Sequence, residues 1–400
     1  AFCEEAKRVF DAVERPVMLS PRPDMMAVAI RSGFSIDRVK AFTTMWKAIH
    51  RHFRDERLVQ LFARYATYVG SSPYLAPGTL VLIAHVEQEG VWAVDGGMYR
   101  LAEAMVRLAG ETGVKVRPAT AARRILVRDG RVRGLVVVPA DAEDDPRETG
   151  EEAIAADAVV VNADTAAVAN GLLGEKVMPA VKPIAEEERS LSAVALSLVA
   201  RPEGLPLARH TVFFSRDYRG EFDEIVRQRR LPSDPTVYVC AQDRLEPPAG
   251  IEAQETAAAD EPMLMLVNAP ANGDSHRYDE DELSRCHQAT FRQLRRCGLT
   301  VVPAEDAIRT TDPAAFDRLF PASGGALYGK ANHTTMASME RPTPRTRIPG
   351  LYLAGGSAHP GAGVPMATLS GRMAAHCLAE DLGSTRRSSR GVTFGGTSTG

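Results

Sequence analysis

The stretch GLYLAGGSAHPGAGVPMATLSGRMAA, Gly350–Ala375, predicts a buried strand, a glycine-rich turn and a helix of small residues. Pro365 suits the first helical position, where a missing N–H group costs nothing. The first-turn amides of Met366, Ala367 and Thr368 would then lack an intrahelical partner and carry the positive end of the helix dipole. This end of the helix would stabilise an acceptor atom or a developing negative charge.

The glycines of this turn are numerous enough to suggest a ligand. With no Cβ in the way, the backbone can approach a bound group closely at Gly355, Gly356, Gly361 and Gly363. An ordinary strand–turn–helix packing unit is the alternative interpretation. Four glycines, a proline and a small-residue helix face together favour a bound cofactor.

The composition of the 400 residues is that of a globular protein with room for two domains, at 44% hydrophobic and 25% charged. A net charge of −3 gives no electrostatic case for binding nucleic acid. The five cysteines are scattered, and no Cys/His spacing predicts a metal site, so none is expected. No signal peptide and no bilayer-length apolar run is found.

Strand-like runs and glycine turns alternate with helical patterns, which predicts an α/β fold in interleaved pieces. Segments 88–172 and 346–383 would share a nucleotide-binding domain, segments 1–87 and 173–345 a second domain, and 384–400 a disordered tail. Apolar residues at helical spacing mark 36–62 and 101–108, and 279–297 is amphipathic. Strands are expected at 91–94, 114–116, 122–127, 132–138, 158–161, 191–199, 211–214, 236–241 and 263–268, with a hairpin at Asp129–Gly130.

Several of these motifs together resemble a known family. The segment PGLYLAGGSAHPGAGVPMATLSGRMAA, and above all its core HPGAGVPMA (His359–Ala367), resembles the C-terminal flavin motif of phytoene-desaturase-type carotenoid dehydrogenases. These belong to the wider amine-oxidase-like FAD proteins. VDGGMYRLAEAM (Val94–Met105), FRDERLVQLFARYATYVGSSPYLAP (Phe53–Pro77) and LFPASGGALYG (Leu319–Gly329) fit the same family, and the hydroxycarotenoid 3,4-desaturase branch resembles the chain most.

The resemblance implies an interleaved fold, with a Rossmann-like FAD domain and a substrate domain of sheet and helices. Such proteins open with a strand followed by GxGxxG, which seats the FAD pyrophosphate on a helix N-terminus. No GxGxxG occurs in these residues, so we expect that βαβ unit to precede Ala1. A paralogue that has lost cofactor binding is the other reading of its absence.

Carried over by position, the family motif assigns cofactor-binding roles to seven residues. Gly355 and Gly356 would lie beside the pyrophosphate and ribityl chain, and the Met366 amide would face the flavin N1/C2=O edge. The residues expected beside the isoalloxazine ring are Gly363, Val364, Pro365 and Met366, and Ala122 is expected to hold adenine through its backbone.

The implied reaction is FAD-dependent desaturation of an acyclic C40 carotenoid, with hydride passing from an allylic C–H to flavin N5. The bond would be C3–C4 of a 1-hydroxy or 1-methoxy carotenoid. No catalytic residue is assigned, since the polyene stabilises the developing cation. His359 is the one candidate, although bracing of the turn is its simpler role, and Asp55, Glu56 and Arg57 are expected to form a solvated helix face.

A C40 polyene is almost insoluble in water, so the resemblance also implies peripheral contact with the inner or photosynthetic membrane from the cytoplasm. The expected contact lies in Phe34–Phe62. The alternatives left open are phytoene desaturase, carotenoid ketolase or isomerase, another flavin oxidase, and a non-catalytic lipid or prenyl carrier. A covalent-flavin amine oxidase is disfavoured because Cys297 is the nearest cysteine before the motif.

Overall fold

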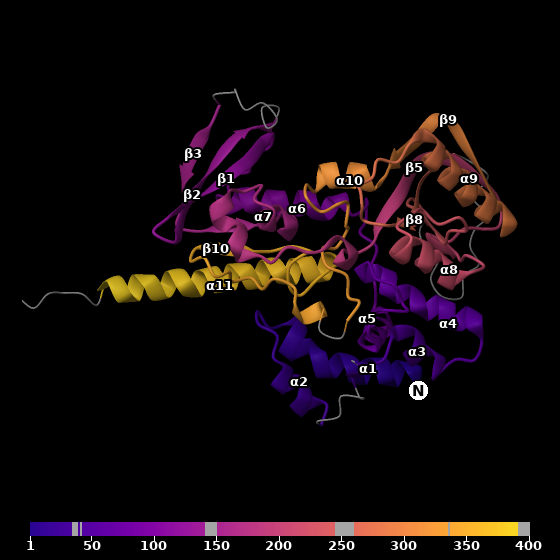
Figure 1. Ribbon diagram of the computed structural model, residues 1–400, viewed down its shortest axis with the longest axis horizontal. Helices are drawn as coiled ribbons and strands as arrows, with labels where there is room; N and C mark the ends of the chain where they lie inside the picture. The colour runs from indigo at the N-terminus through magenta and orange to yellow at the C-terminus, as the bar shows by residue number, and fades with distance from the viewer. Residues whose placement is uncertain (34–38, 41, 141–149, 245–259, 335–336, 391–400) are drawn as a thin grey trace, which may run out of the picture. The chain divides into compact units, whose positions relative to one another are not determined.

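The computed structural model describes residues 1–33, 39–40, 42–140, 150–244, 260–334 and 337–390 (Figure 1). The chain forms two compact units, each built from separate segments. Unit 1 contains Ala1–Ala12, Ala29–Pro118 and Ile184–Ala337. Unit 2 contains Val13–Val28, Ala119–Pro183 and Ser338–Gly400. Interleaving was predicted, but the division differs from the predicted domains in placing 13–28, 173–183 and 338–345 in unit 2 and 88–118 in unit 1.

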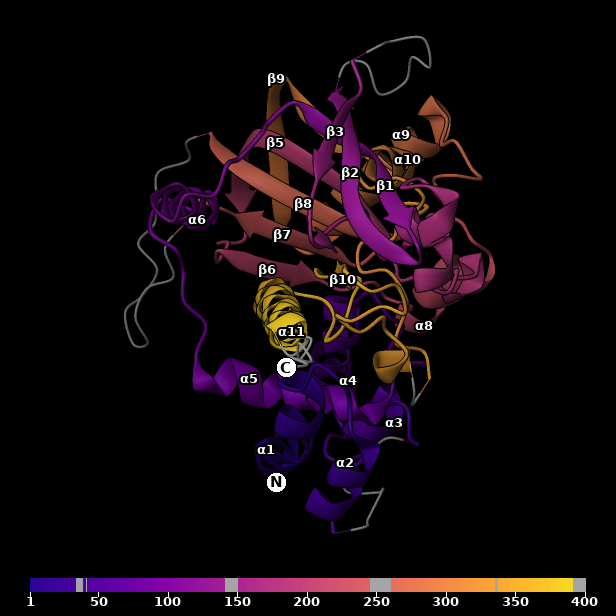
Figure 2. The same cartoon turned by 90° about the vertical axis from the view of Figure 1, so that its left-hand side faces the viewer.

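Unit 1 contains a five-stranded antiparallel sheet with the strand order β6-β7-β8-β5-β9. Its strands, which are labelled in Figure 2, are β5 (Ser192–Gly204), β6 (His210–Phe213), β7 (Val237–Ala241), β8 (Glu261–Ala269) and β9 (Leu299–Thr311). Helix α9 (Glu280–Arg296) packs on this sheet through Cys286 and Leu294, and Asp279 starts it with a capping box. The expected strands and amphipathic helix of this region are therefore present.

The helices of unit 1 enclose a second apolar core, which includes Val9, Met45, Ile49, Val59 and Phe222. Segment 36–62 is not one helix, because α3 ends at His50 and Asp55 caps the start of α4 by accepting the Arg57 amide proton at 2.9 Å. Residues 34–38 and 41 lie outside the described part. The elements, in chain order, are α1 (Phe2–Val13), α3 (Met45–His50), α4 (Glu56–Ala63), η3 (Arg64–Val69), η4 (Gly78–Leu82), α5 (Ile83–Glu89), η7 (Glu186–Glu188), α8 (Tyr218–Phe222), η8 (Asp223–Arg227) and α10 (Pro313–Leu319).

The predicted strands at 91–94 and 114–116 are wrong, since both segments lack regular structure. Val91, Val114 and Val116 are exposed, and neither segment lies beside another strand in the described part of the chain. A strand needs a hydrogen-bonded neighbour, so apolar sequence alone does not form one. The predicted helix between them does form, as α6 (Tyr99–Glu111), although none of its residues is buried.

Unit 2 holds an antiparallel meander and a parallel strand pair. The meander comprises β1 (Thr120–Arg128), β2 (Arg131–Pro139) and β3 (Glu152–Ala155), with the predicted hairpin turn at Asp129–Gly130. Both turn residues have positive φ, as a two-residue hairpin requires. β4 (Val159–Val161) pairs in parallel with β10 (Leu351–Leu353), which leads into α11 (Val364–Arg390). The shorter elements are η1 (Glu14–Met18), α7 (Thr165–Ala169), η6 (Glu175–Ala180) and η9 (Ala337–Met339), while α2 (Met25–Arg31) crosses the division between the units.

The predicted disordered tail is partly wrong, because α11 continues through residues 384–390. Adding a residue to an existing helix costs little, whereas starting a helix is costly. The serine- and arginine-rich sequence is therefore helical where it extends α11. The remainder of the predicted tail, 391–400, lies outside the described residues.

Candidate functional site

The turn between β10 and α11 starts with a close approach of two backbone segments. Strand β10 is fully buried, and the Ala354 N–H donates to the Val161 carbonyl at 2.9 Å. Gly355 has φ +109°, and its N–H donates to Ser370 Oγ at 3.2 Å. A Cβ at Gly355 would lie 2.5 Å from Asn162 Oδ1, so only glycine fits there.

Gly356 differs from Gly355 because its free side faces open space. No atom would come within 4 Å of a Cβ built there, and its φ is not in the left-handed region. The Gly356 carbonyl accepts a 3.0 Å hydrogen bond from Arg341 Nη1. Arg341 is only 2% exposed, and burial lowers its pKa to about 10 while the Asp164 charge opposes that shift. A buried arginine thus supports the turn from beneath and leaves its other side open.

His359 supports the same turn from within unit 2. The ring has no exposed surface, and Nε2 lies 3.0 Å from the carbonyl oxygens of both Val17 and Ser20, so Nε2 carries the proton and donates. The His359 amide donates to the Pro342 carbonyl at 2.9 Å. Burial is the main cause that lowers the pKa of the ring, which favours neutral imidazole. These contacts match the bracing role, and an enclosed ring has no free face for a substrate.

Helix α11 starts one residue earlier than expected. Val364 is its first residue and Pro365 its second, and Gly363 precedes them with φ +98°. The Ala367 amide therefore donates to the Gly363 carbonyl at 2.9 Å, so the expectation that it is unpaired is wrong. Thr368 has an intrahelical acceptor as well, one turn back at Val364. Of the three predicted amides, only that of Met366 has no acceptor among the described residues.

This geometry fits a flavin. Gly363, Val364 and Pro365 are exposed and Met366 is half-buried, so the helix start is accessible. The backbone beside it carries no side chain at Gly355, Gly356 or Gly363, and the Met366 N–H has no protein acceptor. A ligand edge bearing an acceptor atom can therefore meet this amide at the positive end of a 27-residue helix.

Ala122 lies apart from the turn in sequence but in the same unit. It is an exposed residue of β1, opposite Val137 of β2, and a register irregularity follows between Ala122 and Arg124. Such an irregularity disrupts the regular ladder of backbone hydrogen bonds. Its assignment to adenine stays a prediction.

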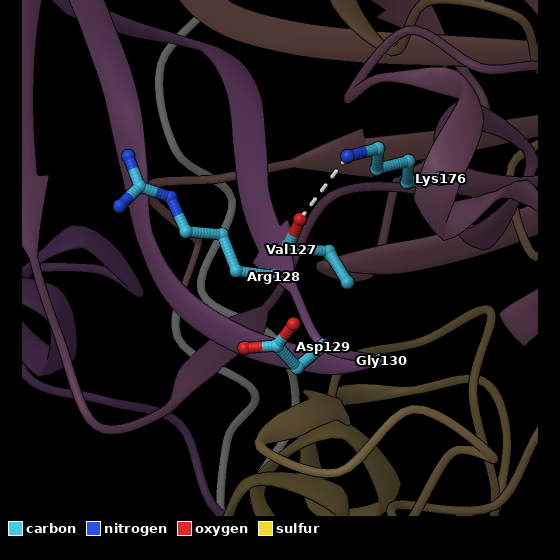
Figure 3. A pocket seen from close by; sticks show the side chains of 5 residues that line it. All are labelled: Val127, Arg128, Asp129, Gly130 and Lys176. Carbon is cyan, nitrogen blue, oxygen red and sulfur yellow. Dashed lines mark hydrogen bonds between the residues drawn. The ribbon is translucent and has the colours of Figure 1, made fainter.

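The hollow drawn in Figure 3 does not coincide with the glycine turn. It is an open depression of about 560 Å³ at the β1–β2 hairpin, lined by Val127, Arg128, Asp129, Gly130 and Lys176. Lys176 Nζ donates to the Val127 carbonyl at 3.3 Å across it. None of the predicted site residues lines it, and its shape follows from the hairpin turn, so we assign it no role.

The polar group Asp55, Glu56 and Arg57 forms a solvent-facing helix start. Arg57 Nη2 bonds Asp55 Oδ2 at 2.7 Å, and this hydrogen bonding lowers the pKa of Asp55 to about 2. Arg57 is 89% exposed, which suits a solvated face. Within the described residues, no group of three or more His, Cys, Asp or Glu side chains is arranged to hold a metal ion.

Sequence reasoning missed the polar residues that hold the turn. The residues that do so are Arg341, Asn162, Ser357 and Ser370. Ser357 Oγ, for example, accepts the Thr165 amide proton at 3.0 Å. Their positions in the sequence give little indication of this role.

Residues 47–379 match the family model described as flavin containing amine oxidoreductase. The chain belongs to this family. It is 48% identical to the hydroxyneurosporene desaturase of Rubrivivax gelatinosus, covering all of this chain and 73% of that protein. It is 42% identical to the hydroxyneurosporene desaturase of Cereibacter sphaeroides, over 96% of this chain and 74% of that protein. A 1-hydroxycarotenoid 3,4-desaturase from Flavobacterium is 30% identical, over 82% of this chain and 64% of that protein.

These similarities confirm the predicted family, the α/β flavoprotein fold and the cofactor FAD. The chain is an FAD-dependent oxidoreductase of the carotenoid desaturase group within the flavin-containing amine oxidoreductases. The residues of the β10–α11 turn fit that cofactor on their own geometry.

Proposed function

We propose that this flavin-containing amine oxidoreductase desaturates an acyclic C40 carotenoid at C3–C4, next to a C1 that bears a hydroxyl or methoxy group. The observation that carries the proposal is the 48% identity to a hydroxyneurosporene desaturase along the whole chain. The carrier alternative is weaker, because a carrier has no use for an accessible amide at a helix start.

The residues of the turn bind and orient the cofactor rather than transfer protons. Gly356 and Gly363 keep the backbone open, Arg341 holds the Gly356 carbonyl, and the α11 start favours negative charge near Met366. A helix-terminus interaction of this type contributes about 0.3–1 kcal/mol, and up to ~2 when partly buried. Bound FAD supplies the hydride acceptor: an allylic C–H gives up a hydride, the neighbouring C–H a proton, and the single bond becomes double.

The test is expression of the whole gene in cells that accumulate 1-hydroxyneurosporene. Extracted pigment should gain one conjugated double bond, seen as a red-shifted absorption spectrum and a new chromatographic peak. The control is Gly363→Val, which should give neither. An unchanged spectrum with every acyclic carotene supplied would overturn the proposed activity, and protein that purifies without flavin and resists reconstitution would favour the carrier.

We also propose that the protein contacts the membrane peripherally from the cytoplasmic side, where its hydrocarbon substrate resides. Among the helices of the described part, none is long and apolar enough to cross a bilayer. The support comes from Phe42, 77% exposed, and from the exposed side chains of Leu58 and Leu61, all within the predicted segment. Apolar side chains held in water gain free energy on entering lipid.

Flotation with phospholipid vesicles tests this contact. Wild-type protein should float, and Phe42→Ser should float less. Tyr99→Ser is the matched control, because Tyr99 is 76% exposed but lies on α6. Failure of the wild type to float would overturn membrane contact, and equal flotation of Phe42→Ser would place it elsewhere.

A further inference from the structure

Within the described part of the chain, Arg64 is a buried cation without an ion-pair partner. It follows α4, and its backbone N–H closes that helix on the carbonyls of residues 60–62. The residue is 8% exposed, and Nε and Nη1 have no acceptor among the described residues. Burying a charge is costly unless hydrogen bonds or an opposite charge compensate. The guanidinium therefore has donors available for an acceptor that the protein itself does not supply.

A second unpaired donor belongs to the apolar core of unit 1 that also contains Tyr65 and Ala66, the residues directly after Arg64. The Tyr218 hydroxyl is buried and has no partner among the described residues. Burial raises the pKa of Tyr218, and the positive charge of Arg64 opposes this rise. Burial also raises the pKa of Tyr328, and the Arg64 charge again opposes the rise. Tyr218 is thus neutral and able to donate a hydrogen bond.

The buried carboxylate of this region, Glu221, makes no hydrogen bond to Arg64 in the described part of the chain. Burial raises the pKa of Glu221, although hydrogen bonds and the Arg64 charge oppose the rise. Glu221 Oε2 accepts hydrogen bonds from Ser215 Oγ at 2.8 Å and Thr236 Oγ1 at 2.6 Å. Glu221 Oε1 has no hydrogen-bond partner among the described residues, so neither oxygen of Glu221 bonds Arg64 there.

Aromatic rings pack around Tyr218. Its ring meets Phe222 edge-on at 5.1 Å between centroids and lies 6.4 Å from Tyr74, which in turn lies 4.7 Å from Trp46. These rings belong to the apolar core of unit 1 or pack against it. A ligand that suits both features is a long hydrocarbon bearing a single oxygen atom.

We propose that Arg64 selects the oxygenated end of the substrate, with its guanidinium donating to the oxygen on C1 and the Tyr218 hydroxyl as a second donor. Both groups donate, so the site accepts a hydroxyl or an ether oxygen alike. The assignment rests on the proposed function and adds its specificity-determining residue. A site built to bond a polar group rejects an analogue that lacks it, because the buried donors then stay unpaired.

The test compares two substrates that differ only at this end. Flavin-loaded protein in lipid vesicles is given 1-hydroxyneurosporene or neurosporene, and the ratio of the two kcat/KM values is measured. Arg64→Met should lower this ratio about 10- to 100-fold, the loss expected for one hydrogen bond to a charged group. Arg57→Met, which changes an exposed arginine of the preceding helix α4, should leave the ratio unchanged.

Thermal unfolding separates recognition from a structural role. Removing an uncompensated buried charge should leave the melting temperature equal or higher in Arg64→Met. Equal loss on both substrates with a lower melting temperature would make Arg64 structural and overturn the inference. An unchanged ratio would also overturn it, because water would then satisfy Arg64.

A second, more conservative variant serves if Arg64→Met does not fold. Tyr218→Phe removes only the hydroxyl and should lower the same ratio several-fold, whereas an unaltered ratio in this variant would contradict the assignment. If the wild type converts neither carotenoid, the proposed function fails and this inference with it. If the wild type converts both and neither variant moves the ratio, only the inference about Arg64 fails.

Discussion

Gly355 lies so close to Asn162 that a Cβ on the glycine would stand 2.5 Å from the Asn162 Oδ1 atom. The two residues follow the ends of the parallel strands β10 and β4, and Gly355 adopts φ +109°. The close approach sets where the chain leaves the sheet and therefore where the turn begins. A side chain at this position would disturb both strand ends.

Gly355→Ala should lower the free energy of unfolding by about 2 kcal/mol or more, since left-handed backbone strain alone costs ~1–3 kcal/mol. Urea unfolding followed by circular dichroism measures the change. In the double variant Gly355→Ala/Asn162→Gly, the contact is relieved but the backbone strain remains, so stability should recover only partly. No recovery would show that the Asn162 contact is not a cause of the loss.

Gly363→Val should abolish flavin retention, because valine is strained at φ +98° and its side chain would enter the approach to the α11 start. The measurement is the ratio of flavin to protein absorbance after purification. Gly371→Ala on the same helix is the control, since a Cβ there meets nothing within 4 Å and alanine favours helix. Retention of flavin by Gly363→Val would show that the position of Gly363 in the site is wrong.

Gly356→Val tests whether the cofactor lies against this backbone, because it adds a side chain without straining the backbone. A Cβ at Gly356 faces open space and its φ is not left-handed, so the melting temperature of the flavin-free protein should stay close to that of the wild type. If the cofactor contacts this backbone, FAD affinity measured by fluorescence quenching should fall at least tenfold. Equal affinity would place the cofactor away from Gly356.

The sequence motif predicted the strand, the glycine turn and the helix correctly because glycine and proline act locally on the backbone. The parallel pairing of β4 and β10 was not predicted, because a short continuous apolar run indicates a buried strand but not its partner. The segments at 91–94 and 114–116 could not be predicted in this way. Their state depends on a pairing partner, which lies outside any local pattern.

The same reason explains which site residues were missed. His359 stood within the motif, so it was noticed, but its contacts with Val17 and Ser20 join positions more than 330 residues apart in sequence. Arg341 and Arg64 read as ordinary charged residues, because burial of an arginine is a property of packing rather than of its neighbours in sequence. Only the structure distinguishes them from the exposed Arg57.

Arg341→Met should destabilise unit 2 by about 3 kcal/mol or more, because it leaves the part-buried Gly356 carbonyl and the Asp164 charge without their buried arginine. Thermal and urea unfolding of the flavin-free protein measure the loss. Arg341→Lys keeps the charge but not the planar fork of the guanidinium. Its stability should therefore lie between those of the wild type and Arg341→Met. If Met and Lys are equally tolerated, Arg341 does not support the turn.

His333 should make stability depend on pH in a defined window. Burial lowers its pKa to about 4, and Nε2 accepts the Ser72 amide proton at 3.2 Å, which requires the unprotonated nitrogen. The folded pKa lies below the unfolded value of 6.5, so between these values the unfolded chain binds more protons. The stabilisation is fully present above pH 6.5 and is lost as pH falls towards 4. A shift of this size corresponds to about 3 kcal/mol.

His333→Gln isolates this contribution, because glutamine keeps an acceptor for the Ser72 amide but does not titrate. Urea unfolding at a series of pH values from 4 to 7 gives the free energy of unfolding for both proteins. Burial also lowers the pKa of His287 and His359, so the variant should retain some pH dependence. The wild type should nevertheless lose more stability than the variant as the solution is acidified. Parallel profiles would mean that His333 is protonated as readily in the folded protein as in the unfolded chain, and that the Ser72 contact does not hold the ring neutral.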